Sequence, residues 1–145
     1  MSILKADALQ GKTAAGDIDV TSEGGAATMQ LQQGLAKAWC NLLGFGTISV
    51  QGSFNTSAIV DNGTGYYKTS FTNNMSNGTY SVSVASHQEQ AGVGSFAYPR
   101  SGTNTDADDG RDAMLTSSLT MQYLNGAEAT RDQEVALTGI LGDLA

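Results

Sequence analysis

Cysteine, histidine and proline each occur once among the 145 residues, and each scarcity excludes a class of structure. A single cysteine, Cys40, excludes an internal disulfide framework. Together with a single histidine, His87, it also excludes the usual zinc site of cysteine and histidine ligands. One proline excludes a proline-rich linker or stalk.

Basic residues and long apolar runs are also scarce. Seven Lys and Arg stand against 14 Asp and Glu, so the net charge is −7 at pH 7. Nucleic acids and anionic membranes bind clustered cations, and the basic residues here are scattered along the sequence. No segment approaches the roughly 20 apolar residues that span a bilayer, and the N-terminal residues lack the apolar core of a signal peptide. We therefore expect no nucleic-acid partner, no membrane insertion and synthesis in the cytoplasm.

What the chain has in quantity is glycine, 18 residues, with many Ser, Thr and Asn. Such a composition is typical of turns between short strands. The length fits one domain, but aromatic residues make up only 7% of the sequence. We therefore expect a thin core.

Residues 1–27 contain short apolar pieces that glycines interrupt. The alternation of Ile18 and Val20 predicts one strand within residues 16–24. No piece is long enough to bury itself. We therefore predict an N-terminal attachment arm over 1–27 that lies on another surface.

Residues 28–43 show apolar residues at spacings of four, three and four, which predicts a helix with a narrow apolar stripe. A helix of about four turns is marginal alone in water, so it must pack against the sheet of its own domain or against copies of itself. We predict a trimer with this helix as its seam. The predicted oligomer interface comprises Leu31, Leu35, Ala38, Trp39 and Leu42.

Residues 44–145 alternate between apolar and polar residues in short runs. The runs lie at 47–54, 58–71, 73–86, 93–98, 115–124 and 134–141. Asn62-Gly63 and Asn77-Gly78 suit two-residue hairpin turns, and Gly52 suits a bulge or a close backbone contact. The fold class predicted is therefore mainly β, with an N-terminal arm and a short helix followed by a small antiparallel β-sandwich over 44–145 that assembles as a trimer.

The polar segment around residues 98–112 is predicted to be an exposed loop that contacts a receptor. Its candidate contact residues are Tyr98, Arg100, Asn104, Asp106, Asp108 and Arg111. Asp106, Asp108 and Asp112 supply oxygen ligands of the kind calcium prefers. The spacing does not fit an EF-hand, because Leu115 stands where the last ligand would be a glutamate. We predict no metal site and no cofactor.

Residues that could perform catalysis are not grouped in the sequence. His87 has no cysteine near it, and the acidic residues gather in segments that are predicted to be solvated loops. Catalytic pairs need an enclosing site that holds both groups. We predict that the chain is not an enzyme.

The stretches "GLAKAW", "SFNTSAIVDNGTG" and "NGTYSVSV" resemble a module of tailed-bacteriophage virion proteins, especially tail fibres of marine and cyanobacterial phages. The similarity covers roughly residues 20–86. Cys40, Leu42-Leu43 and Tyr66 depart from the residues common in that module. The resemblance implies a trimeric fibre or adaptor component whose N-terminal part attaches to other virion proteins and whose β-rich part is exposed.

The predicted function is therefore that of a structural virion protein, a homotrimeric tail-fibre component made in the host cytoplasm that contacts the host surface, including its glycans. Two alternatives stay open. A capsid decoration or head-fibre protein would lay the arm on a neighbouring shell subunit. A carbohydrate-binding module would expose aromatic platforms, for which Tyr66, Tyr98 and Trp39 are the candidates.

Overall fold

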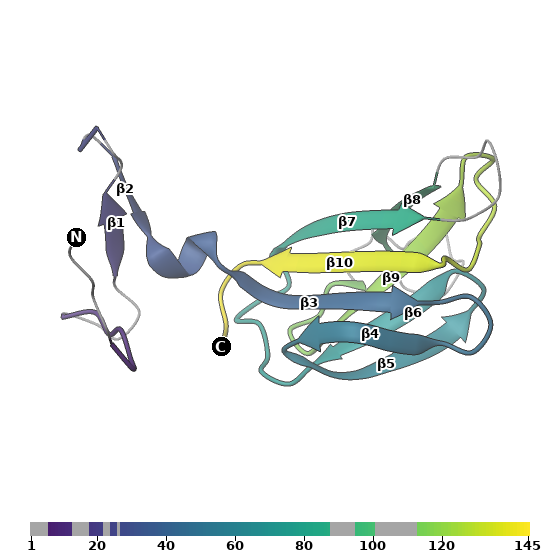
Figure 1. Cartoon of the computed structure of the whole chain (residues 1–145), viewed down its shortest axis with the longest axis horizontal. Coiled ribbons are helices and arrows are strands. Elements are labelled where there is room, and N and C mark those ends of the chain that lie inside the picture. Colours follow the sequence, from purple (N-terminus) through teal and green to yellow (C-terminus); the bar gives the residue numbers. More distant parts are fainter. Residues whose placement is uncertain (1–5, 13–17, 22–23, 26, 88–94, 101–112) are drawn as a thin grey trace. The chain divides into compact units, whose positions relative to one another are not determined.

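The chain divides into two compact units, Met1–Leu35 and Ala36–Ala145, and each is described by itself. The computed structural model describes residues 6–12, 18–21, 24–25, 27–87, 95–100 and 113–145 (Figure 1).

The first unit contains a short hairpin. Strand β1 (Asp19–Thr21) pairs antiparallel with β2 (Thr28–Gln30). A single 3-10 turn, η1 (Leu31–Gly34), follows β2, and the Leu31 amide donates a hydrogen bond to the Ile18 carbonyl at 2.7 Å. Strand β1 lies within the segment for which alternation predicted a strand.

The second unit is a β-sandwich of two antiparallel sheets, as predicted. One sheet has the order β4-β3-β10-β7 and the other has the order β5-β6-β9-β8. Figure 1 shows the first sheet in front of the second. The strands are β3 (Ala36–Leu43), β4 (Ser49–Phe54), β5 (Thr56–Gly63), β6 (Tyr66–Phe71), β7 (Ser81–His87), β8 (Ser95–Pro99), β9 (Ser118–Asn125) and β10 (Val135–Leu141).

The core lies between the two sheets and takes alternate residues from the central strands, because successive side chains of a strand point to opposite faces. On β9, Leu119, Met121 and Tyr123 are buried in the core, as the alternation predicted. Leu115 continues the same alternation, but it lies before the strand begins and is exposed. The Tyr123 and Thr138 hydroxyls lie 3.0 Å apart and form a hydrogen bond that links the two sheets.

The predicted helix over 28–43 is wrong, because Ala36–Leu43 is strand β3. Ala38 and Leu42 fit a helical stripe and also fit a period of two. Cys40 decides between the two patterns, since it is buried on the same face while Trp39 is exposed on the other. Strand β3 hydrogen-bonds to β4 on one side and β10 on the other. These long-range backbone bonds outweigh the weak local preference of the segment.

The hairpin that joins β5 and β6 turns two residues later than predicted. Gly63 pairs with Tyr66, so Thr64 and Gly65 form the turn, with Gly65 at φ +73°. Asn62 is the extra residue of a bulge instead. A Cβ on Gly65 would lie 2.6 Å from the Tyr123 carbonyl oxygen, so only glycine fits that close approach.

The predicted hairpin at Asn77-Gly78 is also wrong. Strand β6 belongs to one sheet, whereas β7 pairs with β10 in the other, so this connection crosses the sandwich. The Asn77 side chain still forms a local turn, because its Oδ1 accepts a hydrogen bond from the Thr79 amide at 2.9 Å. The dipeptide predicted a turn correctly but not which strand would pair next.

A sharp corner at Asn55 carries the chain from β4 in one sheet to β5 in the other. Asn55 has φ 55°, a conformation that asparagine tolerates better than most residues. Its side chain holds the corner, since Nδ2 donates to the Lys37 and Asn73 carbonyls at 3.0 Å and Oδ1 accepts from the Asn73 amide at 2.7 Å. Gly52 lies next to a register shift in β4, as predicted, and the Trp39 ring lies against it.

Candidate functional site

The residues predicted to form a helical seam lie in three different environments. Ala38 and Leu42 are 1% and 4% exposed and belong to the core of the sandwich, so they cannot contact another copy of the chain. Leu31 and Leu35 lie in the first unit, where Leu35 is exposed. Trp39 is 43% exposed on the outer face of β3. Of the residues that the predicted seam takes from the sandwich, only Trp39 is available for assembly.

Trp39 borders an apolar groove on the outer face of the sheet β4-β3-β10-β7. The groove has a volume of about 310 Å³ and crosses β3, β10 and β7. Cross-strand pairing sets Gly139 between Trp39 and Ser83. Because glycine has no side chain, a hollow forms at this point. The lining residues are all uncharged: Trp39, Cys40, Ser83, Val84, Ala85, Leu137, Thr138 and Gly139.

The other sheet carries a different outer face. Phe96 and Tyr98 lie two residues apart on β8, with ring centroids 6.4 Å apart and planes at 20°. Ala97, between them, packs on the core, so both rings point outward. Phe96 is 43% exposed.

Strand register places polar side chains beside these rings. Gln122 of β9 pairs with Tyr98 on one side and with Tyr66 of β6 on the other. Directly opposite residues of antiparallel strands share a face, so the three form one row across the sheet. Arg100 joins the row, because its Nη1 donates to Gln122 Oε1 at 3.0 Å and to the Tyr98 hydroxyl at 3.4 Å. We call Phe96, Tyr98, Arg100, Gln122 and Tyr66 the aromatic face.

Of the predicted receptor-contact residues, the structure brings Tyr98 and Arg100 together. Asn104, Asp106, Asp108 and Arg111 lie outside the described residues, as does Asp112 of the metal candidates. Sequence reasoning missed Phe96 and Gln122. The spacing of Phe96 and Tyr98 was a signal for Phe96, whereas Gln122 joins the face only through strand register.

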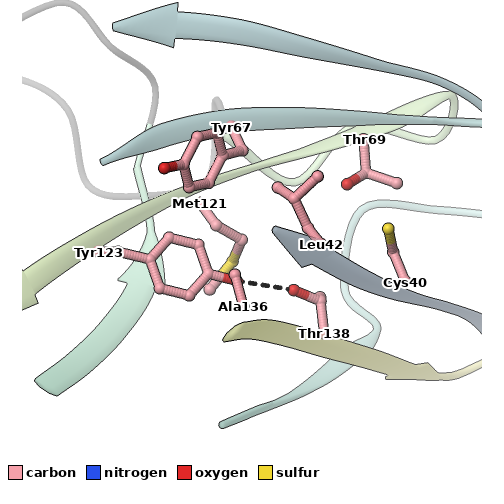
Figure 2. Close-up of a pocket in the computed structure, with 8 residues that line it drawn as sticks. All are labelled: Cys40, Leu42, Tyr67, Thr69, Met121, Tyr123, Ala136 and Thr138. Atoms are coloured by element: carbon pink, nitrogen blue, oxygen red, sulfur yellow. Dashed lines mark hydrogen bonds between the residues drawn. The ribbon is translucent and has the colours of Figure 1, made fainter. Parts of the chain in front are cut away.

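The interior of the sandwich offers no room for a ligand at the cavity shown in Figure 2. This cavity measures about 10 Å³ and lies among the core side chains of both sheets. A water molecule needs roughly 10–15 Å³, so the cavity holds one water at most.

The reactive groups around this cavity are not activated. Burial raises the pKa of the Cys40 thiol, which disfavours the thiolate that would act as a nucleophile. Burial also raises the pKa of Tyr123 to about 12, although the hydrogen bond with Thr138 acts in the opposite direction. Both groups remain neutral near pH 7 and serve as packing residues.

His87 ends strand β7, where it pairs with Val135 of β10 and is exposed. Within the described part of the chain, no three His, Cys, Asp or Glu side chains gather as a metal site would require. Nor do the described residues include a helix long and apolar enough to cross a membrane.

Comparisons with known proteins identify no relative. No family model matches the sequence, and no curated protein and no solved structure matches it either.

Proposed function

We propose that the chain is a structural component of a bacteriophage virion, a non-enzymatic tail-fibre-like subunit that assembles as a homotrimer. The resemblance of residues 20–86 to virion modules supports the virion role. The apolar groove beside Trp39 is the observation that carries the assembly.

The absence of charge in this groove makes it the face where a second copy of the chain can dock with least repulsion. Each chain carries a net charge of −7, so copies repel one another at long range, and least where charged side chains are absent. The groove is lined by uncharged residues, and Trp39 and Leu137 beside it are both exposed. Burying such apolar surface contributes about 25 cal/mol per Å². Contact through this face replaces the helical seam predicted from the sequence.

The mass of the purified protein in solution, measured by light scattering, tests the assembly. We expect three times the mass of one chain for the wild type. Leu137→Glu places a charge in the groove and should yield a folded monomer. Val60→Glu is the matched control, because Val60 is similarly exposed but lies on β5 of the other sheet, and this variant should stay trimeric.

A wild-type protein that is monomeric at all concentrations would contradict the proposal, as would a Leu137→Glu variant that remains trimeric. Circular dichroism of each variant separates loss of assembly from loss of folding.

The virion role needs a separate experiment. We expect the chain among the proteins of purified phage particles, and we expect residues 1–27 to be required for its incorporation. Binding to purified capsids instead of tails would favour the decoration protein. Absence of the chain from purified particles would overturn the virion role.

A further inference from the structure

The aromatic face has the features of a binding site for a sugar ring. The centroid distance of 6.4 Å between Phe96 and Tyr98 lies within the range of offset-stacked rings. Offset rings leave part of each ring surface uncovered, and Phe96 is exposed. The uncovered ring surface is apolar and rigid, since each ring turns about only two side-chain bonds.

The polar groups beside the rings are held in place. Gln122 is almost fully buried, and its Oε1 accepts the hydrogen bond from Arg100. The same guanidinium also donates to the Tyr98 hydroxyl, so it links the ring of Tyr98 to the amide of Gln122. A site that is ordered before the ligand arrives loses less entropy on binding.

We propose that the aromatic face binds a glycan, with a pyranose ring lying on Phe96 and Tyr98. A pyranose has an apolar face of C–H groups and a rim of hydroxyls. The apolar face fits against aromatic rings, and the hydroxyls reach groups such as the Tyr98 hydroxyl and the Arg100 guanidinium beside them.

Single-stranded nucleic acid is the main competitor, because bases also stack on aromatic rings. Its phosphates require clustered cations, whereas this chain carries a net charge of −7. The acidic charge therefore favours a glycan over a nucleic acid as the ligand of the aromatic face.

The inference names a partner for the proposed appendage and rests on that proposal for its biological setting. One pyranose on one exposed face binds weakly. Three copies in one assembly would present three such faces, and avidity can then exceed single-site affinity by about 10²–10⁴-fold.

The test uses the full chain on an array of oligosaccharides built from neutral hexoses, N-acetylated hexosamines and hexuronates. We expect retention on at least one of these classes. Tyr98→Ala or Phe96→Ala should weaken this binding about tenfold or more, because each removes half of the ring surface. Tyr98→Phe keeps the ring and should retain most of the binding.

Phe45→Ala is the matched control, since Phe45 is a highly exposed aromatic residue between β3 and β4, which belong to the other sheet. It should leave binding unchanged. Circular dichroism confirms that each variant is folded. The same array with labelled oligodeoxynucleotides added as competitors tests the nucleic-acid alternative.

Failure of this inference is distinguishable from failure of the proposed function. A trimer that is retained on none of the three sugar classes would overturn the glycan site and leave the assembly intact. Equal losses for Tyr98→Ala and Phe45→Ala would also overturn it, as would competition by oligodeoxynucleotides. Sugar binding by a monomeric wild type would support the site and overturn the homotrimer.

Discussion

The two sheets of the sandwich are alike on the faces that meet and different on the faces that point outward. Inside, both sheets contribute buried apolar residues of similar size, such as Leu119 from β9 and Ile140 from β10. Outside, one sheet presents an uncharged groove beside Trp39, and the other presents stacked aromatic rings with polar partners. Stability therefore resides in the shared interior, and the outer faces are left to serve different contacts.

The largest expected effect comes from truncating one core side chain in each sheet. It tests whether the two inner faces contribute equally to the free energy of unfolding. Leu119→Ala and Ile140→Ala should each lower the free energy of unfolding by about 3 kcal/mol, because each leaves a cavity in a closely packed core. Both side chains are at most 1% exposed. Urea unfolding at a fixed protein concentration measures the loss.

Val60→Ala on the outer face of β5 is the control and should cost under about 1 kcal/mol. A loss for Val60→Ala as large as that for Leu119→Ala would show that the outer face is buried in the folded protein.

A smaller effect is expected when a methyl group is added to a glycine, and it should differ between an inner glycine and an outer one. A Cβ on Gly44 would overlap the Tyr67 hydroxyl and lie 2.5 Å from the ring carbon Cζ. The hydroxyl cannot move aside freely, because it donates a hydrogen bond to Asp132 Oδ1 at 2.9 Å. Gly44→Ala should therefore cost about 2 kcal/mol through overpacking, as measured by thermal or urea unfolding.

Gly139→Ala adds the same methyl group in the outer groove. The nearest atom to that Cβ, in Ser83, lies 3.9 Å away, which is ordinary contact. A change within about 0.5 kcal/mol is expected. Equal costs at the two glycines would contradict the distinction between inner and outer faces.

The effect expected to be smallest at neutral pH involves Tyr123, and it changes with pH. Burial raises the pKa of Tyr123 to about 12, against about 10 for an exposed tyrosine. The folded state thus favours the neutral phenol. Its contribution to stability is fully present below about pH 10 and is lost as the pH rises toward 12.

We expect the free energy of unfolding to fall above about pH 10, by up to about 1.4 kcal/mol per pH unit from this group. Tyr123→Phe should be less stable at neutral pH by about 1 kcal/mol, since it loses the bond with Thr138. Its stability should then depend less steeply on pH in the alkaline range. Identical alkaline slopes for the two proteins would mean that Tyr123 has the same pKa in the folded and unfolded states, and would contradict the effect of burial.

Sequence patterns predicted best the strands in which apolar and polar residue types alternate along the chain. Runs over 115–124 and 134–141 became β9 and β10, and the apolar composition of 93–98 became β8. The helix prediction for residues 28–43 failed because Ala38 and Leu42 fit both a helical period and a period of two. Only the hydrogen bonds from β4 and β10 select the extended form.

The candidate sites were predictable only in part, for a similar reason. Tyr98 and Arg100 were identified from the polarity of their segment, and Trp39 from its place beside the apolar stripe. Gln122 is 24 residues from Tyr98 in sequence, and only the register between β8 and β9 makes them neighbours. No local pattern encodes such a register.

The amino-acid sequence by itself determined the β class, the turn-rich character, the acidic charge and the inward residues of β9, since these depend on composition and on a period of two. The tertiary structure alone decided that β3 is a strand, that β7 joins β10, and that two unlike outer faces form. Those outcomes depend on pairing between segments that are distant in sequence. The backbone hydrogen bonds and the shared burial that hold such segments together cannot be read from any short stretch of sequence.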